Sequence, residues 1–161
     1  MEKEPMLEKT YKKLTAELNF LKNEERGNIA KIIDEARALG DLKENAEYHA
    51  AKDKQGLMEA RINELGYIIG RAQVVDPSKL KHERVSFGSS ITITDIKTQK
   101  EITYTIVGKQ ESNPKEGLIS IQSPIARLLI GKEEGDEVIV NLPSVKTKYD
   151  IEEVFYKEIV I

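Results

Sequence analysis

The sequence has no cysteine and no tryptophan among its 161 residues, and aromatic residues make up only 6%. Without cysteine the chain can form no disulfide, no cysteine-ligated zinc or iron–sulfur site and no thiol nucleophile. Apolar residues never run together for the roughly 18 positions that a membrane-spanning helix needs. We therefore expect a cytoplasmic protein with neither a secretion signal nor a membrane partner.

The chain also lacks a large net charge of either sign. The 25 basic and 28 acidic side chains leave a formal net charge of −3. A protein that wraps duplex nucleic acid by neutralising its phosphates would need an excess of basic residues. Charged residues nevertheless make up 33% of the chain, a proportion that favours long helices exposed over most of their surface.

The N-terminal half has the pattern of two helices that share a narrow seam. Its apolar residues recur at spacings of three and four, and a polar stretch at 23–28 shifts the phase of the first run. The first run consists of Leu7, Tyr11, Leu14, Leu18, Leu21, Ile29, Ile33 and Ala36, and the second of Ala50, Leu57, Arg61, Leu65, Ile68, Ala72 and Val75. Gly40 suits a left-handed position after a helix, and Asp41 is expected to cap the next one. So short a connection requires an antiparallel return, which predicts a coiled-coil hairpin over residues 1–76 with its tip at 39–45.

The C-terminal half is predicted to be a small sheet with one helix. After Asp76-Pro77 the helical period gives way to alternation. The strand candidates are residues 90–94, 101–107, 118–121, 137–142 and 149–156. Ser123 and Pro124 precede an apolar run that ends at Gly131, which is typical of a short helix with Ser as its cap and Pro at its first position. We predict an α+β protein in which the helical hairpin is followed by a small antiparallel sheet domain over residues 80–161.

The predicted tip places two carboxylates, Asp41 and Glu44, at the end of a rod about 50 Å long. One interpretation is structural, with the two acids forming a capping box for the second helix. The other is chemical, because Mg²⁺ is commonly held by one or two carboxylates together with waters and phosphate oxygens. Two ligands hold the ion only if another molecule supplies the rest. The chemical interpretation therefore predicts a partner, and negligible Mg²⁺ binding by the isolated chain.

Basic residues near the tip are candidates for contacts with the phosphates of a single strand, and Tyr48 is available to stack on a base. These basic residues are Arg37, Lys43, Lys52 and Lys54. The alternative is an ordinary solvated helix face, because acidic residues are interspersed among them.

Residues 35–52, which include the run Gly40-Asp41-Leu42-Lys43-Glu44-Asn45, closely resemble the signature of the GreA/GreB family of bacterial transcript-cleavage factors. A second block at 113–135, which carries Ser123-Pro124-Ile125-Ala126-Arg127, resembles the other signature of that family. The two motifs are long and stand in the family's order, so the resemblance covers nearly the whole chain.

The resemblance implies a transcription elongation factor that acts on bacterial RNA polymerase. The coiled coil would enter the secondary channel, and an FKBP-like C-terminal domain would dock at the channel rim through Ser123, Pro124 and Ile125. Asp41 and Glu44 would help to hold a Mg²⁺ shared with the polymerase, which then cleaves the nascent RNA at the 3′ end of a backtracked complex and so rescues arrested complexes. The factor would be an accessory protein rather than an enzyme, and we expect a monomer.

The resemblance also assigns roles to other residues around the tip. Asn45 and Tyr48 fall within the tip signature as supporting residues, and Arg37 and Lys52 occupy positions that contact RNA. The chain departs from the family pattern at two places. Leu7 stands where a helix-capping Thr is common, and Gly27 stands where Pro often follows Arg26.

Two other classes of function remain open at this point. An FKBP-like domain suggests a peptidyl-prolyl isomerase, but such a site needs an aromatic-lined apolar pocket, and Phe87 and Phe155 are the only Phe residues beyond the coiled coil. A coiled-coil adaptor or chaperone is the third interpretation, in which the tip acids act only as caps.

Overall fold

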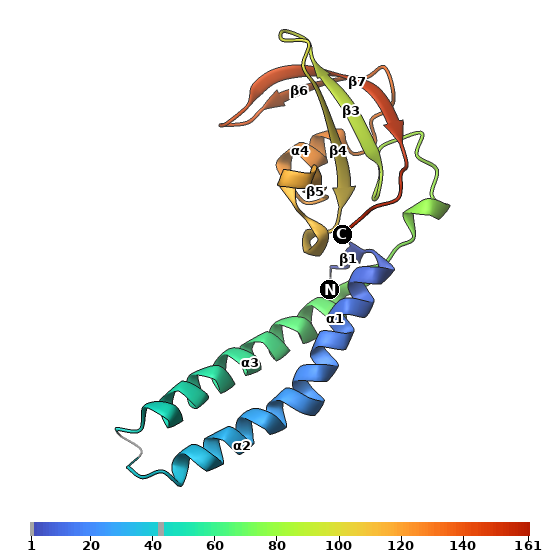
Figure 1. Ribbon diagram of the computed structural model, residues 1–161. Coiled ribbons are helices and arrows are strands. Elements are labelled where there is room, and N and C mark those ends of the chain that lie inside the picture. Colours follow the sequence, from blue (N-terminus) through green and yellow to red (C-terminus); the bar gives the residue numbers. More distant parts are fainter. Residues whose placement is uncertain (1, 42–43) are drawn as a thin grey trace. The chain divides into compact units, whose positions relative to one another are not determined.

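The computed structural model describes residues 2–41 and 44–161, and the chain divides into two compact units. The first unit contains Glu2 and Tyr11–Ala72, and the second contains Lys3–Thr10 and Gln73–Ile161. The α+β prediction is confirmed, because a helical hairpin is followed by a sheet with one short α-helix (Figure 1). In the described part of the chain, no helix combines the length and the apolar character that crossing a membrane requires.

The first arm of the hairpin contains a wide turn. Helix α1 (Glu8–Phe20) passes into a π-helical turn (Leu21–Glu25), which leads into α2 (Arg26–Arg37). Ile29 lies eight residues after Leu21, whereas two regular turns cover about seven residues. Because a π turn takes up an extra residue, both side chains reach the same apolar cluster. The π turn is thus the physical reason for the phase shift in the sequence.

The second arm, α3 (Ala46–Arg71), packs against the first through a narrow apolar seam (Figure 1). The buried cluster consists of Ile29, Ile33, Ala51, Met58 and Ile62, with Leu18, Leu21 and Tyr48 partly buried against it. The predicted stripe on α3 is wrong at its first two positions, because Ala50 is exposed and Leu57 is 74% exposed. Ala51 and Met58 take their places. The predicted and the observed apolar stripes both have a helical period. Which of them is buried depends on how the first arm packs against α3.

Two bidentate ion pairs join the arms. Arg26 donates to Glu59 through Nε and Nη2 at 2.9 Å each, and Arg61 donates to Glu17 at 2.7 and 2.9 Å. The hydrogen bond from Arg61 lowers the pKa of the Glu17 carboxyl. All four side chains are partly exposed, so the pairs add little to the free energy of unfolding. Their geometry instead favours one register of the facing helices.

The second unit is built on a five-stranded sheet in the order β5-β4-β3-β7-β6. The strands are β3 (Ser90–Asp95), β4 (Glu101–Val107), β5 (Leu118–Ser120), β6 (Glu137–Asn141) and β7 (Lys146–Phe155). The prediction of a purely antiparallel sheet is wrong for one pair, because β5 runs parallel to β4. Between them the chain passes through two 3₁₀ turns, Lys109–Glu111 and Pro114–Glu116. This connection carries the chain back to Thr105, so that β5 pairs in parallel with the last three residues of β4.

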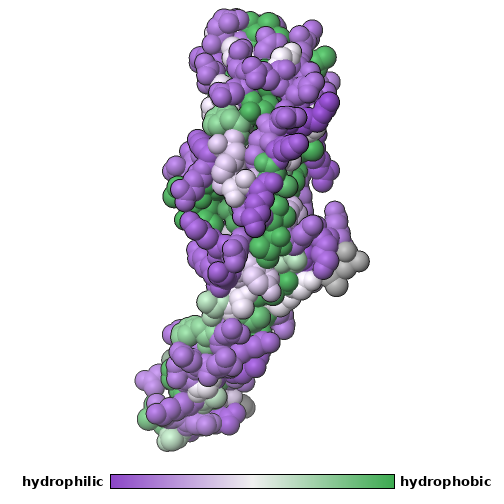
Figure 2. All heavy atoms as spheres, turned by 90° about the vertical axis from the view of Figure 1, so that its right-hand side faces the viewer, coloured by the Kyte–Doolittle hydropathy of each residue, from purple (hydrophilic) through white to green (hydrophobic). Residues whose placement is uncertain are grey.

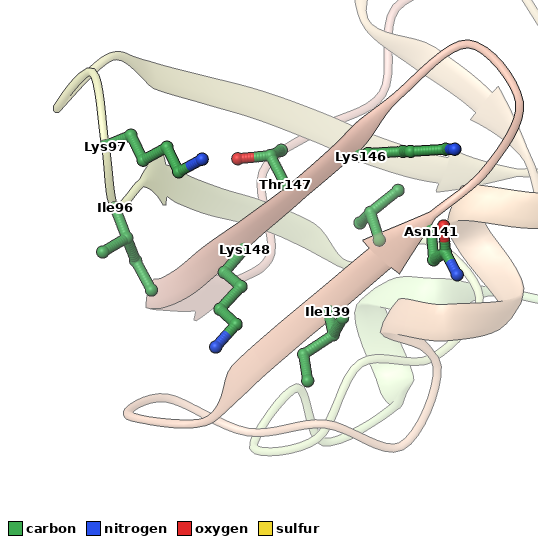
Figure 3. A pocket seen from close by; sticks show the side chains of 8 residues that line it. Ile96, Lys97, Ile139, Asn141, Lys146, Thr147 and Lys148 are labelled. Carbon is green, nitrogen blue, oxygen red and sulfur yellow. The ribbon is translucent and has the colours of Figure 1, made fainter.

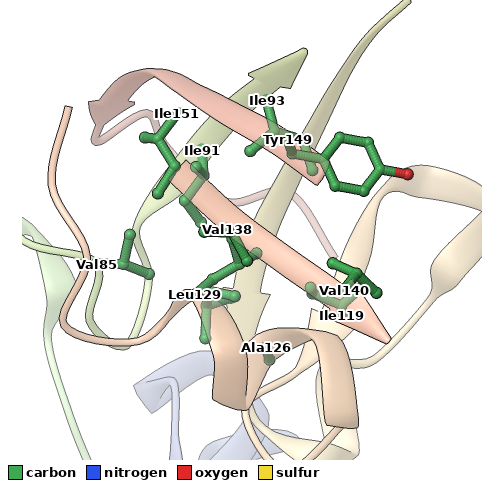
Figure 4. Packing of buried hydrophobic residues seen from close by; sticks show 11 residues of the cluster. Val85, Ile91, Ile93, Ile119, Ala126, Leu129, Val138, Val140, Tyr149 and Ile151 are labelled. Carbon is green, nitrogen blue, oxygen red and sulfur yellow. The ribbon is translucent and has the colours of Figure 1, made fainter. Parts of the chain in front are cut away.

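The short helix α4 (Pro124–Leu129) packs its buried side against the sheet (Figure 4). As predicted, Ser123 is its N-cap, with Oγ accepting from the Ala126 amide at 3.3 Å, and Pro124 is its first residue. Ala126 and Leu129 are fully buried. The other buried members of this core are Val85, Ile91, Ile93, Ile106, Ile119, Val138, Val140, Tyr149 and Ile151.

The segment before α1 contributes to the core of the second unit. Strand β1 (Glu4–Met6) pairs with β2 (Ala72–Val74) in a separate two-stranded sheet, and the Met6 carbonyl accepts from the Val75 amide at 2.9 Å. Leu7 is buried in a cluster with Phe87, Val107, Leu118 and Ile159. The departure from the family pattern at Leu7 therefore coincides with an apolar contact.

Outside these cores the surface is mainly hydrophilic, as the face in Figure 2 shows, with apolar side chains scattered over it. The most exposed large apolar side chains within each unit include Leu39 and Leu57 in the hairpin and Ile139 in the sheet. Exposed apolar residues are ordinary on protein surfaces, so none of them marks a site by itself.

Candidate functional site

The hairpin tip, residues 39–45, presents two carboxylates to solvent. Helix α2 ends at Arg37, and Gly40 has a φ of +131°, a conformation that favours glycine. Asp41 and Glu44 are both exposed on this connection. The predicted basic residue Lys43 lies outside the described residues, as does its neighbour Leu42.

The N-cap of α3 is Asn45. Its Oδ1 accepts from the Tyr48 amide at 3.0 Å, and its Nδ2 donates to the Ala36 carbonyl at 2.6 Å. The prediction that Asp41 and Glu44 form the capping box of this helix is wrong, because the N-cap is Asn45, directly before Ala46. A neutral amide thus caps the second helix and also ties it to the end of the first.

The sequence places Asn45 at the tip, but neither of its two hydrogen bonds was predicted. An Asn directly before a helical run is an N-cap signal, and that signal was present beside the competing Asp41. The bond to Ala36 joins residues nine positions apart across the turn. No local sequence pattern predicts such a bond.

Replacing Asn45 by Ala should lower the free energy of unfolding by about 1–2 kcal/mol, because it removes an N-cap. Asn45→Asp is the matched comparison: it keeps an acceptor for the Tyr48 amide but has no donor for the Ala36 carbonyl, so it should cost less. Urea unfolding followed by circular dichroism measures both. An Ala variant as stable as the parent protein would contradict the assignment of this cap.

The predicted supporting and RNA-contacting residues lie on the flanks of the tip. The Arg37 guanidinium lies over the Tyr48 ring, with 5.9 Å from Cζ to the ring centroid, and 3.9 Å from the Asp34 carboxylate. Tyr48 is partly buried against the seam, so it packs within the hairpin instead of standing open to a base. Lys52 lies about one turn further along α3 and donates from Nζ to Gln55 Oε1 at 3.0 Å.

The tip acids form an incomplete set of metal ligands. In the described ranges, no three or more side chains of His, Asp or Glu come together in a group that could hold a metal ion. Asp41 and Glu44 offer the oxygen ligands that Mg²⁺ prefers, but two carboxylates are too few to replace most of its water shell. The donor set fits Mg²⁺ only as part of a shared site.

The predicted docking residues lie at the start of α4. Pro124 is exposed, whereas Ser123 is half-buried as the N-cap and Ile125 is half-buried against the sheet core. Pro124 therefore presents the open apolar surface, and its two neighbours hold the turn that presents it.

Both halves of the chain match one family of known proteins. Residues 4–74 match "Transcription elongation factor, N-terminal", and residues 80–156 match "Transcription elongation factor, GreA/GreB, C-term". Transcription elongation factor GreA of Sulfurovum sp. (strain NBC37-1) is 70% identical over 161 residues, which covers 100% of this chain and 99% of that protein. The chain belongs to the GreA/GreB family.

Other members of the GreA/GreB family and a solved structure are also similar. Transcription elongation factor GreA of Helicobacter hepaticus is 58% identical over 160 residues, which covers 99% of this chain and 98% of that protein. The crystal structure of GreA factor homolog 1 (Gfh1) of Thermus thermophilus is 23% identical, covers 96% of this chain and 99% of that one, and has a TM-score of 0.44.

As a member of the GreA/GreB family, the chain is a transcription elongation factor that stimulates RNA polymerase to cleave backtracked RNA. It is an accessory factor and not itself an enzyme, because the nuclease activity belongs to the polymerase. Its partner is RNA polymerase.

A pocket beside β6 and β7 gives no support to the isomerase alternative (Figure 3). The pocket has a volume of about 410 Å³. It is lined by Ile96, Lys97, Ile139, Val140, Asn141, Lys146, Thr147 and Lys148. Of these described lining residues none is aromatic, whereas an isomerase of the FKBP type needs an aromatic-lined pocket.

Proposed function

We propose that the hairpin of this GreA/GreB family member enters the secondary channel of RNA polymerase and presents Asp41 and Glu44 at the polymerase active site. The observation that carries the proposal is the position of these two acids. Both are exposed at the tip, and neither is the N-cap of the following helix, because Asn45 has that role. The N-cap role in α3 thus belongs to another residue, and both carboxylates are exposed at the tip.

The two carboxylates act by completing a site that neither protein forms alone. Asp41 and Glu44 would supply oxygen ligands to a Mg²⁺ that the polymerase also ligates. The bound ion would supply Lewis-acid chemistry, by polarising a phosphoryl oxygen and lowering the pKa of a water. The chain's own contribution is position, because Asn45 holds the start of α3 against the end of α2 and so braces the connection that carries both acids.

Arg37 and Lys52 contact the phosphates of the RNA 3′ segment. Both are exposed on the helices that flank the tip, and basic side chains along a groove are the usual contacts for a single strand. The Arg37 guanidinium lies over the Tyr48 ring in a cation–π contact. Tyr48 thus acts through Arg37 and the seam, and not by stacking on a base.

The second unit supplies affinity through the start of α4. Exposed charges on the two partners are screened within about 8 Å at physiological salt, so a docking surface needs an apolar anchor. Pro124 is exposed and held in place by the Ser123 cap and the partly buried Ile125. These features support an anchor at Ser123, Pro124 and Ile125.

Replacing Pro124 by Arg should weaken polymerase binding by about tenfold, as expected when a central apolar anchor is lost. The maximal cleavage rate at saturating factor should stay unchanged, because the tip is intact. Competition against labelled parent protein measures the affinity. Gln110→Arg adds the same charge at another exposed position of this unit and should bind normally. Equal affinities for the two variants would remove the docking role of Pro124.

The proposed function is tested on a halted, backtracked polymerase complex with and without the protein. We expect the 3′ segment of the RNA to be released much faster with it. Calorimetric titration of the isolated protein with millimolar Mg²⁺ should give no binding heat, because the ligand set is incomplete. A tight stoichiometric Mg²⁺ site in the isolated chain would contradict the shared site, and an unchanged cleavage rate would contradict the proposal as a whole.

A further inference from the structure

Glu111 is a carboxylate buried in the second unit, with only 5% of its surface exposed. Its Oε1 accepts from the Gly108 amide at 2.9 Å, and its Oε2 accepts from the Leu7 amide at 3.2 Å. The first bond is local to the 3₁₀ turn after β4, whereas the second spans 104 positions of the chain. One carboxylate therefore fastens the residue that precedes α1 to the connection between β4 and β5.

Two further contacts hold the same N-terminal segment. The Pro5 carbonyl lies so close to Gly108 that a Cβ at this position would be 2.3 Å from its oxygen. The Leu7 side chain is buried among the apolar residues around Val107 and Leu118. We call this arrangement of Pro5–Leu7, Gly108 and Glu111 the N-terminal seat.

The burial of Glu111 is explained by the seat and not by the local turn. A capping carboxylate works at an exposed position, where it keeps its hydration, whereas a buried carboxylate is costly unless both oxygens find donors. Here each oxygen accepts one backbone N–H. The Leu7 amide, just before α1, has its acceptor in Glu111, which is 104 positions away in the chain.

The seat holds the beginning of the arm that leads to the tip. Helix α1 starts at Glu8, inside the segment Lys3–Thr10 that belongs to the second unit, and continues to Phe20 in the hairpin. The second unit is the one that carries the proposed docking residues. A change at Glu111 therefore acts on the start of α1 without touching either the tip or α4.

We propose that Glu111 is a positioning residue for transcript cleavage: it fixes the start of α1 in the unit that docks, so that the arm carrying Asp41 and Glu44 begins from a defined point. This inference rests on the proposed function of the tip. Glu111 contacts neither RNA nor metal, and it acts through the backbone of Leu7. A misplacement of about 1 Å at a reacting group can cost about a hundredfold in rate, so loosening the seat should lower catalysis.

Two chemically different substitutions disturb the seat. Glu111→Gln keeps the size of the side chain but replaces one acceptor oxygen by an NH₂ group, which leaves one of the two amides without an acceptor. Gly108→Ala keeps both oxygens of Glu111, but its Cβ would lie 2.3 Å from the Pro5 carbonyl oxygen and 2.7 Å from Glu111 Oε1, so both must shift. The matched controls are Glu116→Gln, at an exposed glutamate of the next 3₁₀ turn, and Gly56→Ala in α3, where a Cβ meets nothing within 4 Å.

Hydrogen exchange of the full-length protein measures the seat directly. We expect the Leu7 amide and its neighbours in residues 4–10 to exchange faster in both seat variants and at the parent rate in both controls. Cleavage and competition assays then separate affinity from catalysis. The seat variants should bind polymerase with nearly parent affinity, while their maximal cleavage rate at saturating factor falls by about tenfold or more. A purely structural loss would instead lower affinity and rate together.

Each outcome decides one part of the inference. Unchanged exchange at Leu7 in both seat variants would show that the seat does not depend on Glu111 and would overturn the proposal. Faster exchange with a full maximal rate would overturn the positioning role. If Glu111→Gln loses its circular dichroism signal, Gly108→Ala gives the deciding result. If the proposed role of the tip is wrong, variants of Asp41 and Glu44 will cleave at the parent rate. That result would not change the hydrogen exchange expected at Leu7.

Discussion

Replacing Asp41 by Asn, or Glu44 by Gln, is expected to remove stimulated RNA cleavage while polymerase binding stays nearly unchanged. Each change removes a charged oxygen ligand and keeps the size of the side chain. Because a metal ion contributes several kcal/mol of charge stabilisation to such a reaction, the stimulated rate should fall by about a hundredfold or more. Product release from a backtracked complex measures the rate, and competition measures the binding.

The control for these variants is Glu47→Gln, an exposed acid in the first turn of α3. It removes a carboxylate near the tip without removing a proposed ligand, so it should cleave normally. Parent-like cleavage by the variants of Asp41 and Glu44 would refute the metal role. The capping interpretation would not replace it for Asp41, since Asn45 caps α3.

Replacing Leu129 by Ala should lower the free energy of unfolding of the second unit by about 3–5 kcal/mol, because it opens a cavity at a fully buried position. This cost is a large part of the stability of an ordinary domain. Leu129 has no exposed surface and packs into the core between α4 and the sheet, whereas the next residue, Ile130, is 38% exposed. Ile130→Ala is the matched control and should cost far less.

Urea unfolding of both variants, followed by tyrosine fluorescence, measures the difference. Polymerase affinity should fall only if Leu129→Ala is partly unfolded without urea, because the unfolded fraction no longer presents Pro124. Equal costs for the two variants would mean that α4 does not complete the core.

The sheet shows where alternation suffices for prediction. The bounds of β4 are those expected from the sequence, because apolar and polar residues alternate over its length. Strand β7 begins at Lys146, three residues before the predicted start at Tyr149. Lys146 and Lys148 are exposed, so no apolar residue marks that end. Its pairing with β6 extends the strand there.

In the hairpin, the helical period of the apolar residues does not decide which face of α3 is buried. A stripe through Ala50 and Leu57 fits a helix as well as one through Ala51 and Met58, and Leu is the more apolar residue. The choice is made by α2 and the π turn, which lie elsewhere in the chain. The direction of β5 likewise depends on how residues 108–117 fold, and alternation carries no information about direction.

At the tip, residue types were easier to predict than their roles. The positive φ of Gly40 and the exposure of Asp41 and Glu44 agree with what the sequence indicated. The identity of the N-cap differs from the prediction, because both Asp41 and Asn45 are good capping residues. The bond from Asn45 to Ala36 favours one of them, and that bond exists only when both helices are present.

The placement of Lys3–Thr10 in the second unit sets an order of events during synthesis. Residues 11–72 of the hairpin leave the ribosome before most of the second unit exists. Leu7 must therefore remain without Glu111 while residues 73–111 are translated, which takes about 2–8 s at about 5–20 residues per second. The contact between Leu7 and Glu111 joins segments 104 positions apart, so the start of the first helix is completed only after the residues of both hairpin arms have been made.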